Sequence, residues 1–137
     1  TLGFSSAASD VYKRQPFDEG SFLEPTIVSN LDYQSRTATE EIFGPVVTLH
    51  KFEKDEDAVE MANCTEYGLA GSVWTSDSAR GKSLAEKIET GMVWINTWLH
   101  RDLRVPFGGV KNSGVGTEGG RWSLSFFSQP VNICVKE

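Results

Sequence analysis

Two arginines three residues apart are the side chains of this sequence best suited to binding chemistry. Arg101 and Arg104 lie in the segment WLHRDLRVPF, residues 98–107, with Asp102 between them. A guanidinium is a planar fork of N–H donors that can bind a carboxylate through two parallel hydrogen bonds, so this segment could hold an acidic substrate. The alternative is that both arginines pair with Asp102 or face solvent, as surface charges commonly do. The residues alone leave both interpretations open.

The side chains that could act as nucleophiles or metal ligands are few. Cys64 and Cys134 lie far apart, with no CxxC spacing and no histidine close by in sequence, so neither a disulfide framework nor a zinc site is indicated. Both cysteines are expected to be small buried hydrophobes. His50 and His100 show no triad pattern. We therefore expect no metal site and no nucleophile in this chain.

Two glycine-containing motifs are similar to nucleotide-binding patterns but lack the required context. Residues 114–119, GVGTEG, satisfy GxGxxG, yet a dinucleotide fingerprint needs a hydrophobic strand directly before it, and here Lys111 to Ser113 precede it. The triplet Gly81-Lys82-Ser83 falls inside an expected helix. The glycines of 114–119 are expected instead to let the backbone turn tightly and pass close to other segments.

The elements that must position these residues alternate between periods of two and about 3.6, which predicts an α/β fold. Strands are expected at 46–52, 69–75 and 92–96. One expected helix begins at Asp55 and ends at Tyr67-Gly68, and a second, capped by Ser76 or Asp77, runs to about Thr90 with Gly91 as its stop. Crossovers of this length favour a parallel, right-handed βαβαβ arrangement. A glycine-rich loop, an irregular aromatic stretch at 122–127 and a last strand at 131–135 are expected to follow.

Composition is typical of part of a globular enzyme. The 137 residues are 39% hydrophobic, which is enough for a core. The formal charge of −6 and the pI of about 4.9 argue against nucleic-acid or anionic-membrane partners. No apolar run approaches the length needed to span a bilayer, and no signal peptide is evident, so the cytoplasm is the expected compartment.

Three motifs match one known family. FLEPTI at residues 22–27, EEIFGPV at 40–46 and PFGGVKNSGVG at 106–116 resemble, with their spacing, the NAD(P)-dependent aldehyde dehydrogenases. The resemblance implies the C-terminal part of an aldehyde dehydrogenase catalytic domain at 16–128, with a parallel βαβαβ core, and an oligomerisation strand at 129–137. The nucleophilic cysteine, the general-base glutamate and the nucleotide-binding half of that family would lie upstream. We therefore expect this chain alone to be inactive.

The resemblance also implies roles for individual residues. Glu41 would hydrogen-bond the ribose next to nicotinamide, and Phe43 would pack near the nicotinamide ring. Glu118 matches a family glutamate that helps position the general base or its water, although Thr117 stands where the family usually has arginine. The alternatives are that Glu41 is a solvated loop acid, Phe43 a core residue and Glu118 an exposed acid on a glycine-rich loop.

The substrate class follows from a narrower resemblance. Trp98, the RDLR segment, PFGG and the ending NICVK at 132–136 are similar to 2-hydroxymuconic and 2-aminomuconic semialdehyde dehydrogenases. This implies that Arg101, and secondarily Arg104, binds a substrate carboxylate, that Phe107 lines the pocket, and that the cofactor is NAD, with NADP as the alternative. In that chemistry a cysteine thiolate attacks the aldehyde, a hydride passes to nicotinamide, and a glutamate activates water. Another subfamily, such as betaine aldehyde dehydrogenase, or a non-enzymatic oligomerising module remains an alternative.

The first fifteen residues look foreign to the rest. Residues 5–15, SSAASDVYKRQ, back-translate into a transposon-based sequencing adapter, so we expect residues 1–15 not to be native. The alternative is an ordinary arm of small residues. The codons of the source DNA distinguish the two. The native protein is expected to be a homo-oligomer acting on a small aldehyde.

Overall fold

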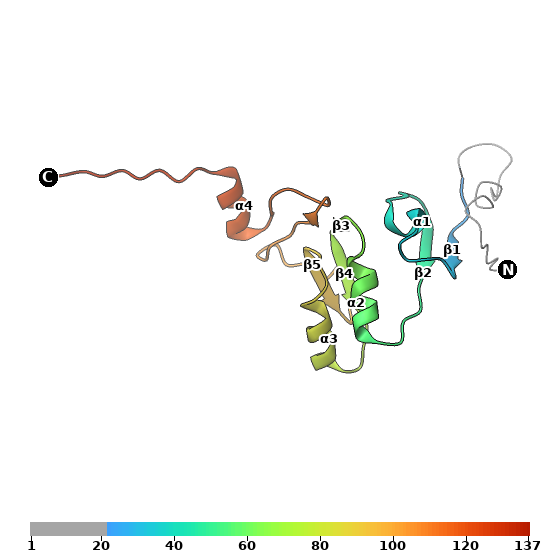
Figure 1. Cartoon of the computed structure of the whole chain (residues 1–137). Helices are drawn as coiled ribbons and strands as arrows, with labels where there is room; N and C mark the ends of the chain where they lie inside the picture. The colour runs from blue at the N-terminus through green and yellow to red at the C-terminus, as the bar shows by residue number, and fades with distance from the viewer. Residues whose placement is uncertain (1–21) are drawn as a thin grey trace. The chain divides into compact units, whose positions relative to one another are not determined.

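The computed structural model describes residues 22–137, so the expectation for residues 1–15 lies outside the described part (Figure 1). The chain divides into two compact units, Thr1–Thr65 and Glu66–Glu137. Each unit brings together a different set of the predicted site residues. They are therefore described one after the other.

The first unit is built on a parallel pair of short strands. It contains β1 (Thr26–Ser29), α1 (Arg36–Thr39), β2 (Val46–Leu49) and α2 (Asp55–Asn63). The strands pair in register from Thr26 with Val46 to Ser29 with Leu49. Val28 is the buried hydrophobic residue of the described chain, at 7% exposure, whereas Val47 and Leu49 remain more than half exposed. The strand pair is thus covered on one face only.

Helix α2 begins where the sequence predicts and ends earlier. Asp55, Glu56 and Asp57 occupy its first turn, where carboxylates favour the positive end of the helix dipole. Asp57 also accepts a hydrogen bond from the backbone N–H of Lys54 at 3.3 Å. The helix stops at Asn63 rather than at Tyr67-Gly68, because those two residues form β3. The expected strand at 46–52 likewise ends early, at Leu49.

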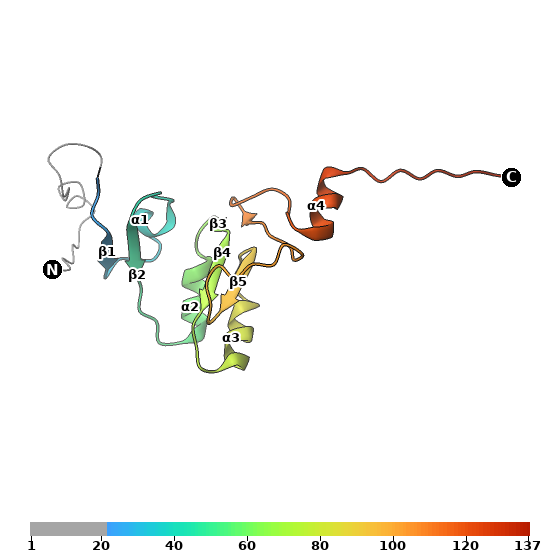
Figure 2. The same cartoon turned by 180° about the vertical axis from the view of Figure 1, so that it is seen from behind.

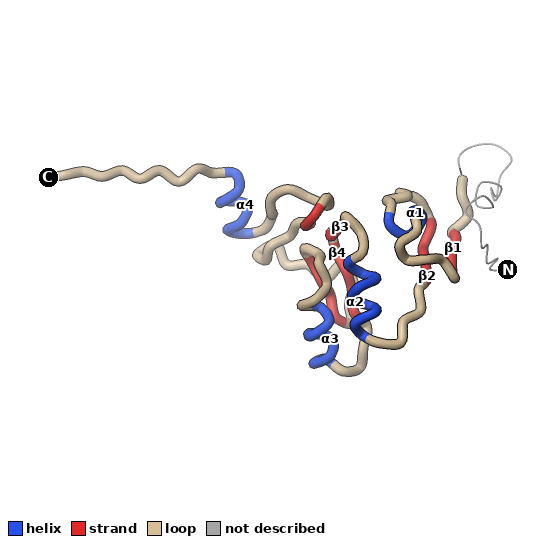
Figure 3. The backbone as a smooth tube through the Cα atoms, in the orientation of Figure 1, coloured by secondary structure: helices blue, strands red, loops and turns tan. Residues whose placement is uncertain are grey.

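The second unit contains a parallel strand–helix–strand unit. β4 (Ala70–Val73) and β5 (Met92–Ile95) pair in register, and α3 (Ser78–Ala85) contacts both strands (Figure 3). Figure 2 shows the same arrangement from behind. Asp77 caps the helix, as predicted, by accepting the N–H groups of Ala79 and Arg80. Gly81 is buried, and a Cβ there would lie 3.1 Å from side-chain atoms of Ile95 and Thr75, so this glycine lets the helix approach the strands. The Gly81-Lys82-Ser83 triplet is therefore a helical packing site.

The remaining elements of the second unit lie beside this core. β3 (Tyr67–Gly68) pairs antiparallel with β6 (Val110–Lys111), a pairing that the sequence did not indicate. A Cβ on Gly91 would collide with the carbonyl oxygen of Gly108, so the chain passes itself closely here. α4 (Gly120–Phe127) follows the glycine-rich loop.

Four expectations need correction. Helix α3 ends at Ala85 and not near Thr90, because the amides of Lys87 and Ile88 donate three residues back, as in a tightened last turn. The three predicted strands do not share one sheet, since β2 pairs with β1 while β4 pairs with β5; the parallel α/β character is confirmed. The stretch at 122–127 is helical, which its aromatic composition concealed. The segment 131–135 has no strand partner among the described residues, and its interface role stays a prediction.

Candidate functional site

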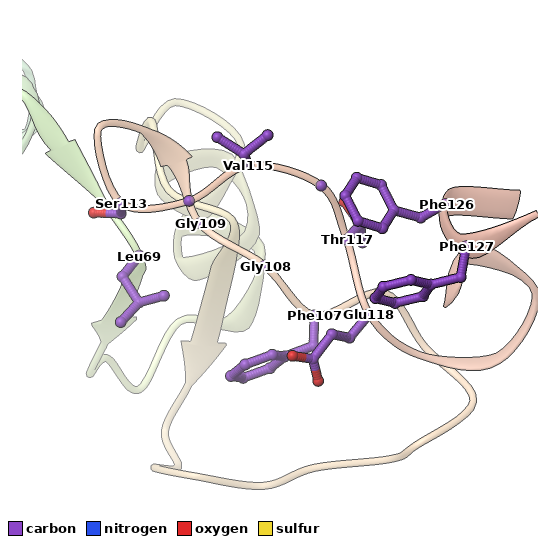
Figure 4. A pocket seen from close by; sticks show the side chains of 12 residues that line it. Leu69, Phe107, Gly108, Gly109, Ser113, Val115, Thr117, Glu118, Phe126 and Phe127 are labelled. Carbon is purple, nitrogen blue, oxygen red and sulfur yellow. The ribbon is translucent and has the colours of Figure 1, made fainter. Parts of the chain in front are cut away.

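A hollow of about 260 Å³ in the second unit is lined by two of the predicted site residues, Phe107 and Glu118. Phe107 and Glu118 face each other in an antiparallel bridge, with N–H···O distances of 2.9 and 2.7 Å, so their side chains lie on the same face. Figure 4 shows both side chains below the loop and the rings of Phe126 and Phe127 at its far end. The hollow therefore combines aromatic walls with one carboxylate.

Arg101 lies on the ring of Phe107. Its guanidinium carbon is 3.7 Å from the ring centroid, which is a cation–π contact. Arg101 is exposed and forms no ion pair within residues 22–137. The guanidinium N–H groups of Arg101 donate to no acceptor among the described residues, so they remain available to a carboxylate. Arg101, Phe107 and Glu118 are thus brought together.

Arg104 is held in a different way, by Asp102. Its Nε donates to both carboxylate oxygens of Asp102 at 2.9 and 3.1 Å, and its backbone N–H donates to Oδ1 at 2.9 Å. The side-chain hydrogen bond from Arg104 lowers the pKa of Asp102, and the same bond raises the pKa of Arg104. The alternative in which Asp102 pairs with an arginine therefore holds for Arg104 and not for Arg101.

Two residues outside the predicted set hold the loop that carries Arg101. Trp94 donates its indole N–H to the carbonyl oxygen of His100 at 2.8 Å, and its ring packs edge-on against Trp98, 5.0 Å between centroids. Asn96 clamps Thr75, accepting its N–H at 2.8 Å and donating to its carbonyl at 2.7 Å. A Trp-x-x-x-Trp spacing directly before the arginines was the only sequence signal for this brace.

The two predicted cofactor residues lie in the first unit, around an open hollow of about 440 Å³. Glu40 is paired with Arg36, Nε to Oε2 2.7 Å, whereas Glu41 has no hydrogen bond or ion pair within the described residues. Phe43 is 94% exposed and has a φ of 55°, which is rare outside glycine. In the first unit, a carboxylate without a partner among the described residues thus lies two positions from an exposed aromatic residue.

The GxGxxG match is now followed by a helix, but its amides are already used. The N–H of Gly119 donates to Oγ of Ser123 at 2.9 Å, and the N–H of Gly120 donates to the carbonyl of Leu103 at 3.0 Å. A Cβ on Gly116 would overlap the Phe126 ring. These glycines serve tight turns and close approach, as predicted, and the start of α4 is not open to a phosphate.

The cysteines offer no reactive arrangement. The Cys64 thiol donates to the carbonyl of Met61 at 3.0 Å and is half-buried. Cys134 is exposed, so the expectation of burial was wrong there, because segment 131–135 stays exposed in the part of the chain that the structure describes. Within residues 22–137 no group of three or more His, Cys, Asp or Glu residues is arranged to hold a metal ion. None of the helices in that range is long and apolar enough to cross a membrane.

The motifs, the parallel α/β core and the aromatic hollow agree with one class of enzyme. The model of the aldehyde dehydrogenase family matches residues 5–133. The chain belongs to the aldehyde dehydrogenase family, whose members are oxidoreductases.

Relatives named for three different substrates are similar to this chain. The chain is 47% identical over 117 residues to the 2-hydroxymuconic semialdehyde dehydrogenase of Pseudomonas sp. (strain CF600) and 44% identical over 117 residues to human 2-aminomuconic semialdehyde dehydrogenase. It is 46% identical over 116 residues to the geranial dehydrogenase of Castellaniella defragrans. Each alignment covers 85% of this chain but 24% of the relative. The chain thus spans about a quarter of their length.

A solved structure shows the same fold. Betaine aldehyde dehydrogenase from Staphylococcus aureus in complex with NAD⁺ superposes with a TM-score of 0.77 at 39% identity. The match covers 83% of this chain and 23% of that one. The predicted family and fold class are therefore confirmed.

Proposed function

We propose that this chain supplies substrate-side and cofactor-side groups of an NAD-dependent aldehyde dehydrogenase that oxidises a carboxylated semialdehyde, 2-hydroxymuconic or 2-aminomuconic, to the acid. Relatives with those two names are 47% and 44% identical to it, which supports the substrate class. The observation that carries the proposal is the state of Arg101. It is the arginine of the loop that stacks beside the hollow without a carboxylate of its own.

Arg101 and Phe107 would act together on the substrate. The ring of Phe107 would hold the guanidinium in place, and the N–H groups of Arg101 would then donate two parallel hydrogen bonds to the substrate carboxylate. Arg104 contributes less, because Asp102 already occupies its fork. Glu118, on the same face as Phe107, is proposed to orient the general base or its water, since its carboxylate lines the hollow.

The same geometry weighs against the alternatives among its relatives. Betaine aldehyde carries a quaternary ammonium group, which an unpaired guanidinium repels. Geranial is uncharged and would leave Arg101 without a partner. Identity alone does not separate these substrates, because the geranial relative is 46% identical. The positive charge of Arg101, which no carboxylate neutralises within the described residues, is what favours an anionic substrate.

The cofactor proposal rests on the first unit. NAD accepts a hydride when bound, and solved relatives contain NAD⁺. Glu41 would accept hydrogen bonds from two vicinal ribose hydroxyls, for which a carboxylate without another partner is suited. Phe43 would form an aromatic wall for the nicotinamide ring, consistent with its exposure and its positive φ. NADP remains the alternative, since neither residue contacts the adenosine ribose in this role.

A chimaera tests the proposal. The 117 aligned residues of this chain replace the matching segment of the Pseudomonas 2-hydroxymuconic semialdehyde dehydrogenase. Formation of NADH is then followed with 2-hydroxymuconic semialdehyde, betaine aldehyde and geranial. A kcat/KM highest for the muconic substrate is expected. A preference for either other aldehyde would refute the substrate class, and inactivity on all three beside an active parent would favour the non-enzymatic module.

Assembly is proposed for the C-terminal segment. Val131, Ile133 and Val135 alternate along it and are each about four-fifths exposed. An extended segment with alternating apolar residues and no strand partner favours pairing with another chain. Light scattering on the purified chain should show self-association, and removal of residues 129–137 should reduce it. A stable monomer at high concentration would contradict this role.

A further inference from the structure

We propose that Trp94 is a positioning residue for Arg101, fixing the backbone directly before it so that the guanidinium stays over Phe107. The inference rests on the proposed function, in which Arg101 binds a substrate carboxylate. Trp94 lies in β5, paired with Ser72 of β4, so its backbone is fixed in the parallel strand pair of the second unit. Its indole N–H donates at 2.8 Å to the carbonyl of His100, the residue that precedes Arg101.

The backbone of this loop needs such a support. Asn96 and Leu99 have φ values of 54° and 56°, in the left-handed region that L side chains seldom adopt. Asparagine tolerates this conformation and is fixed here by its clamp on Thr75. Leu99 is 61% exposed and has no comparable side-chain anchor. Strained conformations persist where surrounding contacts determine them, and the bond from Trp94 holds the His100–Arg101 peptide, one residue after Leu99.

A second brace acts on the other side of Arg101. Asp102 accepts the backbone N–H of Arg104, its carbonyl accepts the N–H of Val105 at 3.2 Å, and the carbonyl of Leu103 accepts the N–H of Gly120. Arg101 is thus the residue between two fixed peptides. Losing the indole donor would release one side and let the guanidinium leave the Phe107 ring.

Trp94→Phe tests this in the chimaera, because it removes the N–H while keeping a ring against Trp98. The kcat/KM for 2-hydroxymuconic semialdehyde should fall about two- to tenfold, the range for one neutral hydrogen bond, and mainly through KM. Activity on a neutral aldehyde should stay within about twofold. Trp74→Phe is the matched control, since Trp74 donates its indole N–H to Ser72 Oγ at 3.1 Å and not to the loop.

A double-mutant cycle separates positioning from general support. If Trp94 acts through Arg101, Trp94→Phe should cause no further loss on the muconic substrate in an Arg101→Ala background. Additive losses, or equal losses on both aldehydes, would overturn the proposal for Trp94. Failure of the proposed function is distinct, because Arg101→Ala alone would then show no preference for the charged substrate.

Hydrogen exchange gives a readout that does not depend on turnover. In Trp94→Phe, amide exchange should rise over residues 97–105 and stay unchanged in α3, whereas Trp74→Phe should leave the loop as it is. This measurement also decides the outcome if the variant loses all activity. A rise that extends through α3 would show that Trp94 supports the whole unit and would overturn the positioning role.

Discussion

Replacing Arg101 by alanine in the chimaera should lower kcat/KM for 2-hydroxymuconic semialdehyde roughly ten- to a hundredfold. A hydrogen bond to a charged group contributes about 1.5–3 kcal/mol, and about 1.4 kcal/mol corresponds to a factor of ten. Removing the guanidinium leaves the substrate carboxylate without this partner in the transition state. A neutral aldehyde makes no such contact, so its kcat/KM should change little.

The structure shows why the ratio between substrates is the quantity to measure. Arg101 also stacks on Phe107 at 3.7 Å, and a cation–π contact at an exposed site contributes about 0.5–1 kcal/mol. Losing this contact can lower kcat/KM by about two- to fivefold, but equally for both aldehydes. The charged-to-neutral ratio of kcat/KM cancels this common part. What remains is the carboxylate interaction.

Two further variants separate the planar geometry of the Arg101 guanidinium from its charge, and Arg101 from the neighbouring Asp102–Arg104 pair. Arg101→Lys should restore activity on the charged substrate only partly, because an ammonium keeps the charge and loses the planar fork. The double variant Asp102→Asn with Arg104→Gln removes the neighbouring pair without altering net charge. That ion pair is exposed, with Arg104 at 88% in its side chain, and the amide oxygen of Asp102→Asn can still accept the backbone N–H of residue 104, so losing the pair should matter little and equally for both aldehydes. Equal losses on charged and neutral aldehydes in Arg101→Ala would show that Arg101 is structural.

The first unit yields two more predictions. Glu41→Ala in the chimaera should raise the KM for NAD roughly tenfold, whereas Glu40→Ala should not, because Glu40 is held by an ion pair; equal effects would contradict the assignment. The hydroxyl of Tyr33 donates to Glu60 at 2.8 Å, and this bond raises the pKa of Tyr33 above its usual value. The neutral phenol makes the bond, so its stabilising effect is present below the usual tyrosine pKa and is lost as pH rises through the raised one. An ultraviolet absorbance titration should show a lower Tyr33 midpoint in Glu60→Ala, and an unchanged midpoint would refute the pairing.

The sequence predicts those parts of the fold that local signals determine. The acids at Asp55 and the cap at Asp77 placed two helix starts correctly, because capping and dipole effects act within one turn. The partner of β2 was missed, since pairing depends on contacts distant in sequence. Helix α4 was missed because Trp122 and the phenylalanines that follow favour strands when considered alone. Tertiary context overrides such propensities.

The candidate site likewise has parts that the sequence predicts and parts that it does not. The motifs identify four candidate residues by type. The structure adds that Glu41 and Phe43 line one hollow and that Phe107 and Glu118 line another. The stacking of Arg101 on Phe107 spans six residues of irregular loop, which no periodicity predicts. The brace from Trp94 depends on a backbone carbonyl, so the identity of His100 gives no sign of it.

Asp102 decides which of the two arginines can serve a substrate. Arg104 binds this carboxylate through both its side chain and its backbone N–H, whereas Arg101 forms no bond to it. Arg101 is left to the face of Phe107, where its charge is stacked but not neutralised. An acid between two bases therefore makes them unequal: one is fixed as part of the loop, and the other has no carboxylate partner among the described residues, as the proposed function requires. A substrate with a single carboxylate matches the one guanidinium that this arrangement leaves available.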